Sequence, residues 1–99
     1  MADSDSKRSV DWDAIGYVIS SKYRVAVLRN LSSGPATPTT IADASELGIT
    51  HISRALRRLE DRNIVELIVP EEQQKGRLYA LTDKGEQTWE GIQVTGMLS

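Results

Sequence analysis

The side chains of this sequence that could do chemistry are concentrated between residues 50 and 58, in the stretch THISRALRR. If the stretch is helical, successive residues turn by about 100°, and Ile52, Leu56 and Leu59 share one apolar face. The opposite arc holds guanidinium, hydroxyl and imidazole groups, with Asp61 the only acid near its centre. Guanidinium forks match phosphate oxygens and the major-groove edge of guanine, and hydroxyls donate to phosphates or bases. This arc is therefore a candidate nucleic-acid surface, and it consists of Thr50, His51, Ser53, Arg54, Arg57 and Arg58.

A second interpretation of the same arc stays open at this point. A charged outer face of a helix is usually only solvated, and Asp61 could form ordinary intrahelical pairs with Arg57 or Arg58. An exposed histidine without a function is about as common as one that contacts a base or a phosphate, so His51 alone indicates little. The neighbouring elements therefore have to distinguish a functional face from a solvated one.

A short helix and a tight connection are expected directly before the arc. Thr37 followed by proline is typical of a helix N-terminus and predicts a helix over 38–45. The tripeptide LGI at 47–49 predicts a tight turn that contains glycine. The next helix is expected over 50–62 with Thr50 as its cap. These two helices and their turn have the pattern of a helix-turn-helix.

A β-hairpin is expected directly after the second of these helices. From Ile64 the β-branched and aliphatic residues predict a strand over 64–69, which Pro70 ends. A turn with Gly76 near its end precedes the returning strand over 77–81. A helix-turn-helix followed at once by a hairpin indicates a winged helix-turn-helix, which favours DNA contact by the polar arc.

Three further helices complete the expected fold, which is α+β and mainly α. Asp11 is expected to cap the first, and Ser20 or Ser21 the second. Thr82 with Asp83 opens the third. The predicted helices are 12–20, 22–31, 38–45, 50–62 and 83–94, the hairpin strands are 64–69 and 77–81, residues 1–8 form a disordered tail, and residues 9–96 form a single domain.

The charge of the chain is unevenly distributed. Twelve Lys and Arg against fourteen Asp and Glu give a formal net charge of −2, which by itself argues mildly against nucleic acid. Residues 1–13 and 83–90 each sum to −2, whereas residues 22–29 sum to +3 and residues 50–62 to +2. A basic centre between acidic ends can form a local positive face that the total conceals.

Several classes of function find no support in the composition. The 99 residues contain no cysteine and one histidine, so we expect no disulfide, no thiol chemistry, no metal and no cofactor. No apolar run approaches the length of a membrane span, and the first eight residues lack the apolar core of a secretory signal. Glycine-rich phosphate loops and catalytic constellations of nucleophile and base are not found, so we expect no enzyme. The expected location is the cytoplasm.

Two stretches of the chain resemble a known family. TPTTIADASELGITHISRALRRLEDRNIVELI, followed by KGRLYALTDKG, resembles the winged helix-turn-helix of prokaryotic transcriptional regulators, especially archaeal ones akin to the MarR and ArsR groups, over about residues 11–92. The resemblance implies sequence-specific binding of double-stranded DNA, with helix 50–62 in the major groove, and commonly a homodimer. It also implies that the hairpin forms a wing against phosphate or minor groove. The residues expected to bind DNA are Thr50, His51, Ser53, Arg54, Arg57, Arg58 and Thr39, with Lys75 and Arg77 on the wing.

The sequence departs from this family pattern in two respects. ArsR-type metal sensors use cysteine or clustered histidine ligands, which are absent here, and MarR proteins have longer terminal helices around a ligand pocket. Metal sensing is therefore not supported, and a small-molecule effector stays unknown. Glu71 and Glu72 place acid on the wing, which leaves wing contact with DNA open. A winged helix that binds an acidic protein of the transcription machinery is the alternative function.

The terminal helices carry more apolar residues than a small core needs. The core already has aliphatic residues to fill it, among them Val27, Leu28, Ile41 and Leu67. Exposed apolar patches of several hundred Å² usually mark an interface. Capping of the domain's own core by the two tryptophans is the alternative. The sequence therefore predicts a homodimer interface formed by Trp12, Ile15, Ile19, Trp89 and Ile92.

Overall fold

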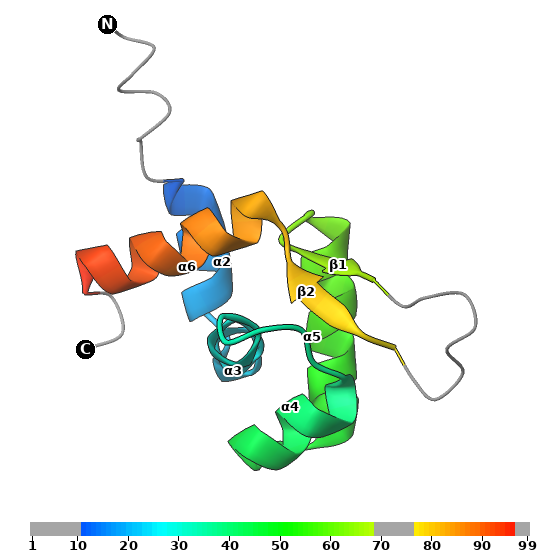
Figure 1. The fold of residues 1–99 in the computed structure, drawn as a ribbon. Coiled ribbons are helices and arrows are strands. Elements are labelled where there is room, and N and C mark those ends of the chain that lie inside the picture. Colours follow the sequence, from blue (N-terminus) through cyan, green and yellow to red (C-terminus); the bar gives the residue numbers. More distant parts are fainter. Residues whose placement is uncertain (1–10, 69–76, 97–99) are drawn as a thin grey trace, which may run out of the picture.

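The computed structural model describes residues 11–68 and 77–96, which form five helices and a two-stranded antiparallel sheet (Figure 1). The predicted class, α+β and mainly α with a winged helix-turn-helix order, is confirmed. The predictions for residues 1–8, Glu71, Glu72 and Lys75 lie outside the described residues. The elements are α2 (Trp12–Ile19), α3 (Lys22–Leu31), α4 (Pro38–Ser45), α5 (Ile49–Asp61), β1 (Val65–Leu67), β2 (Tyr79–Leu81) and α6 (Asp83–Thr95).

Side-chain caps begin four of the helices where the sequence predicts them. The Asp11 carboxylate accepts a hydrogen bond from the Ala14 amide at 3.1 Å, and the Ser21 hydroxyl accepts from the first turn of α3. Thr37 caps α4 through the amide of Thr40, and Thr82 caps α6. Each cap satisfies an amide that the helix leaves without a partner.

The turn inside the helix-turn-helix differs from the predicted one. Helix α5 begins at Ile49 with Gly48 as its N-cap and no side-chain cap, so the prediction that Thr50 caps it is wrong. The Ile52 amide already bonds to the Gly48 carbonyl at 3.0 Å, which places Thr50 inside the first turn. The left-handed residue of the connection is Glu46, with φ 61°, whereas Gly48 has extended backbone.

The hairpin strands are shorter than predicted, and a third segment joins them. Val65 pairs with Leu81 and Leu67 with Tyr79. On its other edge, Tyr79 exchanges two backbone hydrogen bonds with Ala36, at 2.9 and 3.0 Å. Strand β2 therefore lies between β1 and the segment that leads into α4, a pairing that the sequence did not predict.

Helix α3 is the centre of the packing, because it contacts every other helix and β2. The apolar face of α5 packs onto it with Ile52, Leu56 and Leu59, all essentially without exposed surface. Leu67, a predicted core residue, is exposed. The hairpin extends away from the helices at this point (Figure 1), so Leu67 keeps 41% of its surface exposed.

No described helix is long and apolar enough to cross a membrane.

Candidate nucleic-acid interface

Helix α5 presents the predicted polar arc to solvent. Its apolar stripe faces α3 and α4, and the side chains opposite to that stripe have no element over them. Ser53 is half-buried at the edge of the arc. The remaining members of the arc are exposed, namely Thr50, His51, Arg54, Arg57 and Arg58.

The three arginines of the arc have no acidic partner among the described residues. No carboxylate oxygen of residues 11–68 or 77–96 lies within 4.0 Å of their side-chain nitrogens, and no side-chain hydrogen bond joins them to another described residue. The intrahelical pairs that Asp61 could form with Arg57 or Arg58 are not present. Three positive charges close together on one helix are therefore available to an external anion.

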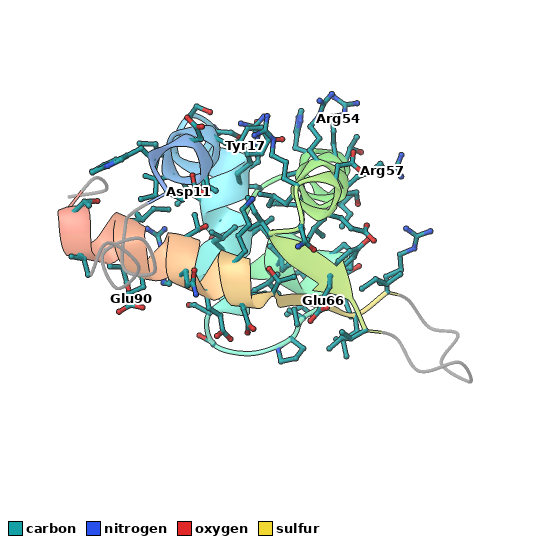
Figure 2. The ribbon with its side chains drawn as sticks, turned by 90° about the horizontal axis from the view of Figure 1, so that it is seen from above. Asp11, Tyr17, Arg54, Arg57, Glu66 and Glu90 are labelled. Atoms are coloured by element: carbon teal, nitrogen blue, oxygen red, sulfur yellow. The ribbon has the colours of Figure 1, made fainter. Side chains whose placement is uncertain are left out.

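A row of like charges runs along α5. Arg54 and Arg58 in α5 and Arg62, its C-cap, follow at intervals of four residues, so successive positions are about 6 Å apart along the helix axis. Like charges at this spacing destabilise a helix by about 0.2–0.5 kcal/mol per pair. Figure 2 shows Tyr17, Arg54 and Arg57 at one edge of the molecule and Glu66 and Glu90 at the opposite edge. The repulsion between these guanidinium groups favours a polyanion at this surface, which we call the basic edge and which begins with Arg54, Arg57 and Arg58.

His51 is held against α3 by an aromatic contact. Its ring stacks on that of Tyr23, with centroids 4.6 Å apart and planes 14° from parallel. The Lys22 ammonium lies 5.5 Å from the centroid of the same Tyr23 ring. The first turn of α3 thus lies beside the first turn of α5, which the sequence did not predict.

Arg24 and Arg62 are two further members of the basic edge that the sequence prediction missed. Each guanidinium carbon lies 3.8 Å from the centroid of the Tyr17 ring. Arg62 continues the four-residue row of α5 from Arg54 and Arg58, and this repeat was the available signal. Nothing in the sequence places Tyr17 beside it, because α2 and the end of α5 are far apart in the chain.

The remaining predicted DNA-binding residues lie at two other places. Thr39 is exposed on the first turn of α4. Arg77 is exposed beside β2, and a side-chain hydrogen bond with Tyr79 raises the pKa of Arg77 above its ordinary value. Arg77, like any exposed arginine, is a cation at physiological pH. Neither residue adjoins the α5 row by a contact that the structure shows.

The residues predicted for a dimer interface separate into two groups. Ile15 and Ile92 have 1% and 0% of their surface exposed, and Trp89 has 9%, so these three are core residues of the single chain rather than an exposed face. Trp12 is 57% exposed, and Ile19 is partly buried against the core. Val94 on α6, which was not predicted, is 74% exposed. The correction follows from the packing of α6 against α2, which covers the facing sides of both helices.

The described residues form no cluster of potential metal ligands. Within residues 11–68 and 77–96, no three His, Cys, Asp or Glu side chains gather in an arrangement that could hold a metal ion. The chemically distinctive feature of these residues is instead the basic edge, which suits recognition of phosphate and base edges by hydrogen bonds and charge.

A family model described as the HVO_A0261 N-terminal domain matches residues 12–95 of the chain. No curated protein sequence matches the chain significantly. The fold is similar to that of the MarR family transcription regulator SP03579, with a TM-score of 0.67 and 27% identity over 73% of this chain and 48% of that one. It is also similar to the transcriptional regulator BldR from Sulfolobus solfataricus, with a TM-score of 0.69 and 22% identity over 87% of this chain and 63% of that one.

A third similar structure is NMB1585, a MarR family regulator from Neisseria meningitidis, with a TM-score of 0.63 and 23% identity over 73% of this chain and 51% of that one. Two of these three structures are named MarR family regulators, the family that the sequence resemblance indicated, and the third is named a transcriptional regulator. The chain spans about half the length of the first structures it matches.

Proposed function

The chain belongs to the HVO_A0261 N-terminal domain family, and we propose that it binds double-stranded DNA sequence-specifically and regulates transcription. The observation that supports this most directly is the exposed face of α5, where Arg54, Arg57 and Arg58 have no acidic partner among the described residues. This helix is the second of a helix-turn-helix pair, which is the element that enters the major groove in such folds. The names of the three similar structures described above, each a transcription regulator, support the regulatory part.

Each residue of the polar arc has a proposed role. Arg54, one turn inside α5, donates two hydrogen bonds to the O6 and N7 atoms of a guanine. Arg57 and Arg58 flank it and contact phosphates or a neighbouring base. The hydroxyls and the imidazole at the helix start, together with the first turn of α4, bond to the adjacent backbone, and these residues are Thr50, His51, Ser53 and Thr39.

The functional form in this proposal is a homodimer. One short recognition helix reads only a few base pairs, and a two-fold axis places a second helix about one DNA turn away. The exposed Trp12 and Val94, on two helices that pack against each other, supply apolar surface for the contact. The wing residues Lys75 and Arg77 add phosphate contacts in each protomer.

Selection from a random duplex library tests the proposal, because the selection itself defines the preferred sequence. The purified chain is expected to enrich one sequence, and its affinity for that duplex should exceed its affinity for random duplex by about 10³ or more. Arg54→Ala should abolish the enrichment, whereas the matched variant Arg29→Ala, which removes a guanidinium beside Trp89, should retain it.

The salt dependence of binding distinguishes the alternative function. DNA binding should weaken linearly in log salt, by about 0.9 log per phosphate neutralised. A chain that enriches no duplex sequence, and whose binding to random duplex does not respond to salt, would contradict the proposal and favour a protein-binding winged helix.

A further inference from the structure

Tyr17, Arg24 and Arg62 bring two positive charges onto one aromatic ring. Both guanidinium carbons are 3.8 Å from the ring centroid, so the two carbons are separated by no more than twice that distance. The ring face attracts each cation, but the two cations repel each other. No carboxylate of the described residues lies within ion-pair distance of either group.

Most hydrogen-bond donors of this cluster are unused. Arg24 donates from Nη1 to the Tyr17 carbonyl at 2.7 Å and to the Ser20 hydroxyl at 3.0 Å. These bonds fix its guanidinium against the end of α2 and leave its Nε and Nη2 donors without a partner among the described residues. The Arg62 side chain makes no hydrogen bond to a described residue. A guanidinium presents five donors in a rigid fork that matches the oxygens of phosphate.

The position of the cluster relates it to the α5 row. Arg62 follows Arg54 and Arg58 at intervals of four residues, and each step of four turns the side chain by about 40° around the helix. The row therefore moves from the exposed arc of α5 toward α2, where Tyr17 lies (Figure 2). The cluster thus lies at the end of the surface that is proposed to enter the major groove.

We propose that Tyr17, Arg24 and Arg62 form a phosphate-binding site. This inference rests on the proposed function for the identity of the ligand. In DNA binding, the ligand is a backbone phosphate of the duplex, outside the base pairs that α5 reads. The ring holds both guanidinium groups in place before binding, so little side-chain freedom is lost when the phosphate arrives. Such a contact adds affinity and fixes the register of α5 without reading sequence.

The test measures the salt slope of binding to a random duplex, which needs no operator. Arg62→Gln is the primary variant, since the Arg62 side chain makes no hydrogen bond that the fold would lose. It should flatten the slope of log affinity against log salt by about 0.9, while Arg62→Lys keeps most of the slope. The matched control Arg29→Gln removes the same charge beside Trp89 and should leave the slope unchanged.

A second measurement follows the Arg62 Nε–H resonance in the parent protein by NMR. Inorganic phosphate at constant ionic strength should shift this resonance, whereas chloride should not, and the shift should weaken in Tyr17→Ala. If the parent binds random duplex and both Arg62→Gln and Arg29→Gln leave its slope unchanged, the DNA role of the cluster is overturned and the proposed function survives.

Two other outcomes distinguish a phosphate of duplex DNA from a free phosphate or from no phosphate site at all. If the parent binds no duplex but its Arg62 resonance responds to phosphate, the proposed function fails and the cluster is a site for a free phosphate or a small phosphorylated molecule. If the resonance responds to neither phosphate nor duplex, no phosphate site exists here.

Discussion

Gly85, in the first turn of α6, lies directly against the backbone carbonyl of Ile64, the residue that leads from α5 into β1. A Cβ at Gly85 would overlap the Ile64 carbonyl oxygen. The same carbonyl accepts a hydrogen bond from the Thr82 amide at 3.1 Å, and the Thr82 hydroxyl donates to the Asn63 carbonyl at 2.7 Å. The start of α6 is thereby attached to the end of the proposed recognition helix.

We expect Gly85→Ala to destabilise the fold by about 1–3 kcal/mol, because the new methyl group meets backbone that cannot move aside. Gly16→Ala is the matched control: a Cβ there meets nothing within 4 Å, and alanine in a helix interior is favoured by about 0.5–1 kcal/mol. Urea unfolding of both variants measures the difference. Equal effects of the two substitutions would contradict the close approach at Gly85.

Arg54→Ala should reduce affinity for the selected duplex at least tenfold and affinity for random duplex much less. A bidentate contact to guanine contributes about 1–3 kcal/mol of discrimination, and the Arg54 side chain makes no contact that the fold needs. Fluorescence anisotropy with both duplexes gives the two affinities, and the thermal midpoint should stay close to that of the parent. The assignment of base readout to Arg54 fails if both affinities fall by the same factor.

Neutralising Lys75 and Arg77 together should weaken binding to selected and random duplex by a similar factor. Both charges are proposed to meet phosphates, so the salt slope should flatten by up to about 1.8. Arginine stays charged between about pH 6 and pH 9, and hydrogen bonding with Tyr79 raises the pKa of Arg77 further, so the contribution of Arg77 should not change in this range. An unchanged slope in the double variant would place the wing away from DNA.

Trp12 and Trp89 should respond differently to substitution. Trp89 is a core residue, so Trp89→Ala should cost about 3–5 kcal/mol of stability. Trp12 is mostly exposed, so Trp12→Ser should leave stability nearly unchanged and shift a dimer toward monomer. Light scattering at micromolar concentration reports the mass of each, and a monomeric parent would refute the proposed homodimer.

The sequence by itself determined the local features of this protein. Caps at Asp11, Thr37 and Thr82 depend on side chains within three residues of the amides they satisfy, so they can be predicted without a fold. The apolar stripe of α5 and its polar arc follow from helical periodicity alone, and burial of Ile52 and Leu56 confirms the stripe. Here local chemistry and the final structure agree.

The tertiary structure decided which surfaces remain available. Packing of α6 on α2 buried Trp89, Ile92 and Ile15, although their spacing on each helix was equally compatible with a dimer face. Packing of α2 and α5 on the same helix, α3, accompanies the contacts of Arg62 with Tyr17 and of His51 with Tyr23, which join residues 45 and 28 positions apart in the chain. Periodicity determines which side of a helix is apolar. Only the packing of the helices determines which other residues contact that side and the residues that border it.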